Sequence, residues 1–235
     1  AENPEFSKLL KEQEGYSIVK TVGAHPVEFC QVLFPWFIRV VDRVSAYEGR
    51  DHRYLWIQSF PIDEDHEPSL KSYPLLHATL TSIAGYARKD PAGFLAHLAN
   101  WQISDRMMVH RLLCRGLVVV APHYPQEVLA YLLADSRRLA VGNMRNAYSG
   151  TQSVIRALAP ALSPGERLQL EQVIYAWTPH PPRPDDDEQR EKERKEWNEE
   201  TRLRLLKAFP EESRSPALRR VILEMVAAHG PVRDE

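Results

Sequence analysis

The fold is decided by a short stretch in the second half of the chain, Ser163-Pro164-Gly165-Glu166, which apolar residues at helical spacing follow. Proline is favoured at the first helical position because its missing N–H would be unpaired there and its φ angle is already helical. Ser163 and Glu166 fit the capping box, in which each side chain bonds the backbone of the other residue. The stretch therefore predicts the start of a helix.

The same signal recurs along the chain. Proline stands where a helix is expected to begin five times, at Pro26, Pro91, Pro125, Pro164 and Pro216. The segments that begin with His25-Pro26 and Tyr124-Pro125 also place a glutamate two residues after the proline, where the helix dipole favours a negative charge. Repetition of one helix start at intervals typical of helical repeats predicts an all-α chain of repeated helix pairs.

The expected helices are separated by short turns. They span residues 3–13, 25–46, 70–88, 91–101, 105–121, 125–134, 149–161, 164–177, 188–209 and 216–229, with an irregular part at 47–69. Pro35 lies inside the second of these and predicts a kink or a break. In helix 164–177 we assign Leu168, Leu170, Val173, Ile174 and Trp177 to the packed face. One helix pair cannot cover both of its faces, whereas stacked pairs share a core, so we expect an α-solenoid of antiparallel pairs of the HEAT or TPR kind.

Three regions are expected: a helical-repeat solenoid at 1–177, a Pro-rich linker at 178–187, and a terminal helix pair with a charged extension at 188–235. The linker holds Pro179, Pro181, Pro182 and Pro184 and is expected to be stiff and extended. It includes a minimal Pro-x-x-Pro motif at 181–184, and we expect residues 178–200 to be mobile.

The amino-acid composition of the chain excludes several classes of protein. With 43% hydrophobic and 26% charged residues the chain can form a core, and its 18 prolines against 10 glycines favour helices over sheets. A net charge of −2 gives no overall attraction to nucleic acid or anionic membrane.

Cys30 and Cys114 lie in apolar helical patterns, which predicts buried thiols and a cytoplasmic location. No stretch is apolar and long enough to span a bilayer, and since the chain opens directly into a helix without Met, we expect a piece of a longer protein.

No motif for catalysis is present. The chain has no zinc-ligand spacing, no phosphate-binding glycine loop and no nucleophile elbow, so no cofactor or metal is expected. The acidic run around Asp63 and Asp65 departs from a calcium loop at the required glycine and glutamate positions. His77, His97 and His110 fall on expected helices and are interpreted as packing residues, with a site assembled from them as the enzyme alternative.

Candidate partner-binding residues lie in the segment after helix 125–134: Arg137, Arg138, Arg145, Asn146 and Tyr148. Loops between repeats align along one edge of a solenoid, where partners bind. The competing interpretation is that Arg137 and Arg138 satisfy carbonyl groups at the end of that helix. A third function, nucleic-acid binding through Arg137, Arg138, Arg145 and Arg156, requires a continuous basic groove and is disfavoured by the balanced charge.

The stretch Pro125-Gln126-Glu127-Val128-Leu129-Ala130-Tyr131-Leu132-Leu133-Ala134-Asp135-Ser136-Arg137-Arg138-Leu139, with the segment from Ser149 to Pro164, resembles a repeat unit of large bacterial STAND-type NTPases. The resemblance covers about half of the chain. It implies the α-solenoid sensor region of such proteins, many of which act in antiphage defence, without the ATPase signature. The expected function is therefore to bind a protein partner and relay that event to an effector elsewhere, in an oligomeric state that the sequence leaves open.

Overall fold

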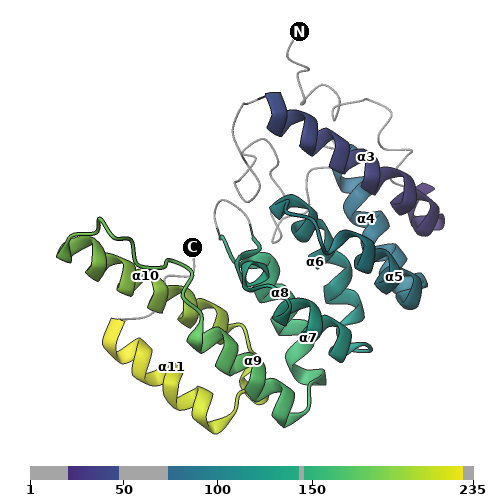
Figure 1. Cartoon of the computed structure of the whole chain (residues 1–235). Coiled ribbons are helices and arrows are strands. Elements are labelled where there is room, and N and C mark those ends of the chain that lie inside the picture. Colours follow the sequence, from purple (N-terminus) through teal and green to yellow (C-terminus); the bar gives the residue numbers. More distant parts are fainter. Residues whose placement is uncertain (1–20, 48–73, 143–145, 230–235) are drawn as a thin grey trace. The chain divides into compact units, whose positions relative to one another are not determined.

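The computed structural model describes residues 21–47, 74–142 and 146–229. Every regular element in these ranges is helical, which confirms the all-α class for the described part of the chain (Figure 1). The expected helix at 3–13, most of the irregular part at 47–69, and Arg145 lie outside the described residues. Among the described helices none combines the length and the hydropathy that a bilayer span requires.

All five prolines begin a helix, as predicted. Pro26, Pro91, Pro125, Pro164 and Pro216 are the first residues of α3, α5, α7, α9 and α11. Residues near these starts supply caps: the Asp90 carboxylate accepts a hydrogen bond from Gly93 N at 2.9 Å, and Ser163 with Glu166 forms the expected capping box. Local sequence therefore fixes where the helices begin.

The described residues divide into two compact units, one that ends at Val120 and one that starts at Ala121, with Gly142 grouped with the first. This division falls before the last residue of the expected helix 105–121 and leaves the Pro-rich segment inside the second unit. The expected region boundaries at 177 and 187 do not coincide with it.

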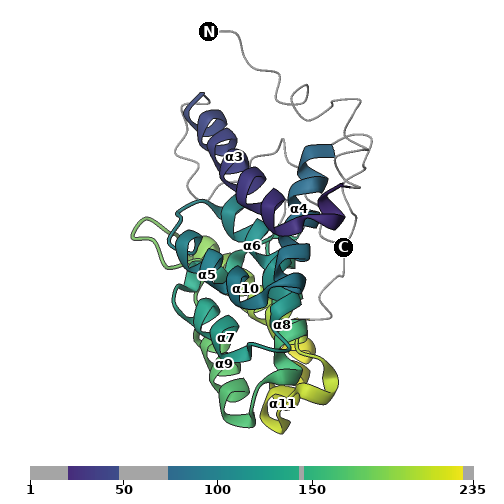
Figure 2. The same cartoon turned by 90° about the vertical axis from the view of Figure 1, so that its right-hand side faces the viewer.

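The first unit contains α3 (Pro26–Tyr47), α4 (Pro74–Lys89), α5 (Pro91–Trp101) and α6 (Met107–Val120). Helix α4 contacts the other three, and α5 also packs on α6, so the expected pair 70–88 and 91–101 is formed (Figure 2). The core of this unit consists of fully buried side chains from all four helices: Phe34, Phe37, Leu76, Ile83, Phe94, Leu112 and Leu117.

Helix α3 runs without interruption through Pro35, so the expected break is absent. Phe34 and Phe37 are completely buried on either side of this proline. Burial of one such side chain contributes roughly 1.5–3 kcal/mol, which for two residues offsets the cost of about 3 kcal/mol for an interior proline.

The second unit contains α7 (Pro125–Leu133), η1 (Ser136–Ala140), α8 (Ser149–Leu158), η2 (Ala159–Ala161), α9 (Pro164–Ala176), α10 (Glu188–Lys207), η3 (Glu211–Ser213) and α11 (Pro216–His229). Helix α9 packs against α7 and α10, and α10 packs against α11. The expected pair 188–209 and 216–229 is therefore formed. The core of this unit includes Val128, Leu132, Val154, Ile155, Leu158, Leu170, Ile174, Leu205 and Phe209.

Candidate protein-interaction surface

Helix α9 presents an uncharged surface to solvent. Leu168 and Tyr175 are 42% and 52% exposed, and they lie two helical turns apart on one side of the helix. The exposed positions from 168 to 176 carry no charge; we call them the α9 face, which consists of Leu168, Gln169, Gln172, Tyr175 and Ala176. Protein interfaces are depleted of charge at their centre and enriched in tyrosine. This composition is therefore that of a contact surface.

The rest of the second unit holds α9 in a fixed rotation about its axis. On the side away from the α9 face, Leu170 and Ile174 are fully buried. Glu171 is also buried, and its carboxylate accepts hydrogen bonds from the Ser215 hydroxyl at 2.7 Å and from Ser215 N at 3.3 Å. Arg167 donates to the carbonyl oxygens of Ser213 and Leu162 at 2.8 and 2.9 Å. These contacts keep the α9 face turned outward.

Both ends of α9 are also fixed. At the N-terminus, the Ser163 hydroxyl and Ser163 N donate to Glu166 Oε2 at 2.6 and 2.9 Å, and these hydrogen bonds lower the pKa of Glu166. Helix α7, which lies beside α9 in both views (Figures 1 and 2), contributes Gln126, whose side-chain amide donates to Glu166 at 3.4 Å. At the other end, Arg202 of α10 donates to the Tyr175 carbonyl oxygen at 3.2 Å. The surface is therefore rigidly supported.

The sequence interpretation placed Leu168 in the packed face with Leu170, and the exposure of Leu168 shows that this assignment was wrong. The packed face of α9 is narrower than its apolar residues suggest, since Leu170 and Ile174 are fully buried whereas Val173 and Trp177 are only half-buried. A usable signal was present: positions 168, 172 and 175 share one side of a helix, and none of them is charged in a chain with 26% charged residues. Sequence reasoning missed this surface because it assigned every leucine to the core.

Arg138 lies inside the second unit. Its guanidinium donates to the Tyr131 carbonyl oxygen, in the last turn of α7, at 2.7 Å, and it stacks 4.4 Å from the centre of the Tyr131 ring. The residue is 8% exposed. Arg138 therefore satisfies a carbonyl group at the end of α7, as the competing interpretation proposed, and its guanidinium is not accessible to a partner.

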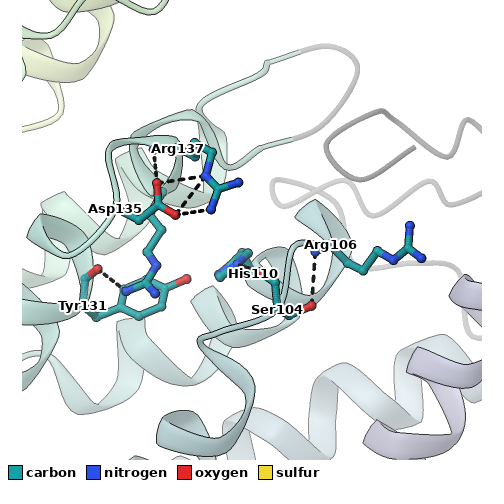
Figure 3. Close-up of polar contacts among 7 residues, drawn as sticks. Ser104, Arg106, His110, Tyr131, Asp135 and Arg137 are labelled. Carbon is teal, nitrogen blue, oxygen red and sulfur yellow. Dashed lines mark hydrogen bonds and ion pairs between the residues drawn. The ribbon is translucent and has the colours of Figure 1, made fainter. Parts of the chain in front are cut away.

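Arg137 is exposed but engaged with its own loop. Figure 3 shows its guanidinium against both carboxylate oxygens of Asp135, with Nε at 2.9 and 3.0 Å and Nη2 at 2.6 Å. Arg137 N also donates to Asp135, and together these hydrogen bonds and charges lower the pKa of that carboxyl group. A partner would have to compete with Asp135 for this arginine.

Asn146 and Tyr148 shape the start of α8. The Asn146 side chain accepts from Tyr148 N at 3.0 Å and donates to Gln152 at 2.8 Å. The Tyr148 hydroxyl lies 2.9 Å from the Thr201 hydroxyl of α10. The structure thus gives four of the five candidate residues internal contacts, while the fifth, Arg145, is outside the described residues.

We predict opposite outcomes for the two neighbouring arginines. Arg138→Ala removes a buried charged hydrogen bond and is expected to lower the free energy of unfolding by about 2 kcal/mol. Arg137→Ala removes an exposed ion pair and is expected to change it by less than about 0.5 kcal/mol. Urea denaturation of the two variants measures both values, and equal losses would contradict the assignment of Arg138 to the interior.

The three histidines of the enzyme alternative occupy separate environments. His77 Nδ1 lies 3.3 Å from the Thr81 hydroxyl, and His110 Nε2 donates to the Ser104 carbonyl oxygen at 2.8 Å. The ring of His97 packs among Phe34, Tyr86 and Trp101, with ring centres 4.9, 5.9 and 6.3 Å away, and desolvation lowers its pKa. Within the described ranges no three His, Cys, Asp or Glu residues are grouped so as to hold a metal ion.

Both cysteines are buried, as expected. Desolvation raises the pKa of the Cys30 thiol to about 12, although a hydrogen bond with Ser82 acts in the opposite direction. A thiol with this pKa stays protonated at neutral pH and is a poor nucleophile. Cys30 is therefore a core residue.

Neither known family models, nor curated protein sequences, nor solved structures yield a match to this chain. Its function is accordingly inferred from its own residues and from the α9 face.

Proposed function

We propose that the chain is a non-catalytic protein-binding scaffold built from helical repeats, and that the α9 face is its contact surface. The observation that carries the proposal is the uncharged, rigidly supported surface around Leu168 and Tyr175. Tyrosine supplies a large contact area at a small entropic cost, and the two glutamines between the apolar residues supply hydrogen-bonding groups. A purely solvated helix, by contrast, carries charges on its exposed side, as α10 does.

The repeated proline-marked helix starts support a larger architecture, a stacked α-solenoid. In this proposal the chain is the sensor or regulatory region of a larger bacterial NTPase of the STAND type, of the kind that acts in antiviral defence. The α9 face then recognises a protein, and the nucleotide chemistry belongs to another part of the parent protein.

The test is capture of a partner by variants of the α9 face. Leu168→Glu and Tyr175→Glu each place a charge within the α9 face, and each is expected to weaken partner binding at least about 30-fold, the effect of losing a hot spot worth 2 kcal/mol. Crosslinking from a lysate of the source cells, followed by mass spectrometry, identifies the partner, and titration with the purified partner measures the affinity.

Leu223→Glu is the matched control, since Leu223 is a leucine on α11 that is 69% exposed, more than Leu168 at 42%. It introduces the same charge outside the α9 face and is expected to leave partner binding unchanged. Equal binding by wild type, Leu168→Glu and Tyr175→Glu would refute the assignment of this surface.

A further inference from the structure

The segment that joins α9 to α10, residues 178–187, displays its prolines to solvent. We call it the strap. Pro181, Pro182, Arg183, Pro184 and Asp185 are all exposed. Residues that precede proline are confined to extended or polyproline II conformations, and this applies to His180, Pro181 and Arg183. The covalent structure therefore restricts the backbone at these three positions to a range that includes the form that polyproline-binding domains recognise.

Helix α10 holds the strap at its first end through a reciprocal pair of hydrogen bonds. His180 N donates to Asn198 Oδ1 at 2.8 Å, and Asn198 Nδ2 donates to the His180 carbonyl oxygen at 3.0 Å. Asn198 is buried, so these hydrogen bonds are shielded from water. The ring of His180 also meets Trp197 edge to face, with ring centres 6.0 Å apart.

The second end is held by a buried ion pair between Asp186 and Arg194 of α10. Asp186 also closes a turn, because its carboxylate accepts from Arg183 N at 2.9 Å and its own N–H donates to the Arg183 carbonyl oxygen at 3.2 Å. The prolines between these two anchors are thus presented as a fixed loop on the surface of the second unit. An open cavity of about 580 Å³ adjoins the strap, lined by residues that include Pro181, Arg183 and Trp197.

Arg183 adds a positive charge beside the exposed prolines of the strap. Its side chain is exposed and makes no hydrogen bond or ion pair with any other described residue. The charge of Arg183 also affects His180. Desolvation makes the largest contribution to lowering the pKa of His180, and the charges of Arg183 and Arg194 lower that pKa further. An exposed arginine among prolines is suited to pair with a carboxylate at the edge of a partner's groove.

We propose that residues 181–184 are a preorganised polyproline ligand for a partner domain whose aromatic-lined groove takes the prolines and whose acidic residues pair with Arg183. Binding of a free proline-rich peptide is opposed by the entropy of ordering its ends. The anchors at His180 and Asp186 remove much of that cost before the partner arrives. This site is separate from the α9 face and takes a different class of partner.

The experiment is a titration of the isotope-labelled full chain with three purified probes: an SH3 domain, a WW domain and an EVH1 domain. We expect at least one of them to shift the amide resonances of Arg183 and Asp185. Pro181→Ala, Pro184→Ala and Arg183→Glu are each expected to weaken that binding at least about tenfold, the equivalent of 1.4 kcal/mol. Pro160→Ala, which changes an exposed proline outside the strap, is the control and should bind like wild type. Dissociation constants above about 1 mM for all three probes would overturn the proposal.

The contribution of the anchors is tested separately. Asn198→Ala releases the first anchor and is expected to weaken binding about tenfold while leaving residues 181–184 intact. A synthetic peptide of residues 178–187 that binds as tightly as the full chain would show that anchoring contributes nothing, and would overturn the preorganised character of the site. Tyr175→Glu should leave probe binding to the strap unchanged. The proposal for the strap and the proposal for the α9 face can therefore be refuted independently.

Discussion

Replacement of Gly116 by leucine is expected to lower the free energy of unfolding by about 3 kcal/mol. Gly116 lies on α6, where α5 brings the ring of Phe94 against the helix backbone, and a Cβ atom at position 116 would overlap the tip of that ring. Phe94 is completely buried and cannot move aside without disturbing its neighbours. Chemical denaturation followed by circular dichroism measures the loss.

A double-mutant cycle shows whether the overlap is the cause. Phe94→Ala alone leaves a cavity and is expected to cost about 3–5 kcal/mol. Combined with Gly116→Leu, the new side chain occupies part of that space, so the double variant should be more stable than the sum of the single losses by about 1–3 kcal/mol. Gly165→Ala is the control, since a Cβ atom there meets nothing within 4 Å. Strict additivity of the two single losses would show that the glycine acts for another reason.

The helix starts were predictable because each depends on a few neighbouring residues. Pro91 and Pro164 need no tertiary partner to favour the first helical position, and the caps at Asp90 and Ser163 involve residues three positions apart. Local physical chemistry also decided the class of the fold. For this reason the predicted and observed helices agree within the described residues.

Exposure was harder to predict, because apolar spacing does not reveal which neighbour covers a helix. Leu168 and Trp197 fit the spacing of packed residues, yet both are exposed. The helices that pack on α9 are α7, which precedes it by two short elements and a helix, and α10, the next helix along the chain. The spacing of apolar residues in α9 does not show which of its sides these two helices cover. The α9 face is defined only once those contacts are known.

The environment of Arg138, in the segment that follows α7, was also not predictable from the sequence alone. The sequence interpretation placed Arg138 in a connecting loop, where it could either cap α7 or meet a partner. In the structure Asp135 caps the N-terminus of the short 3-10 helix η1, and Arg138 is buried with its guanidinium on the Tyr131 carbonyl oxygen. An Asp-Ser pair after a helix is a signal for such a turn, but the direction in which the next arginine points depends on packing.

Asp186→Asn is expected to destabilise the second unit by about 3–5 kcal/mol, the cost of leaving one member of a buried ion pair without its counter-charge. The Asp186 and Arg194 side chains are 12% and 9% exposed. The amide keeps the shape of the carboxylate and can still accept the hydrogen bond from Arg183 N, so the loss reports mainly on the missing charge. Urea denaturation of the full chain gives the value.

The matched control is Glu191→Gln on the same helix. It makes the same change from carboxylate to amide in the Glu191–Lys195 pair, whose side chains are 55% and 71% exposed although the two charged atoms are 2.6 Å apart. Water and salt screen such a pair, so the expected cost is below about 0.5 kcal/mol. Both variants change a carboxylate to an amide opposite a basic side chain, so the difference between them measures mainly what burial adds. A difference below about 1 kcal/mol would mean that water reaches Arg194, and the strap would then be anchored mainly by Asn198.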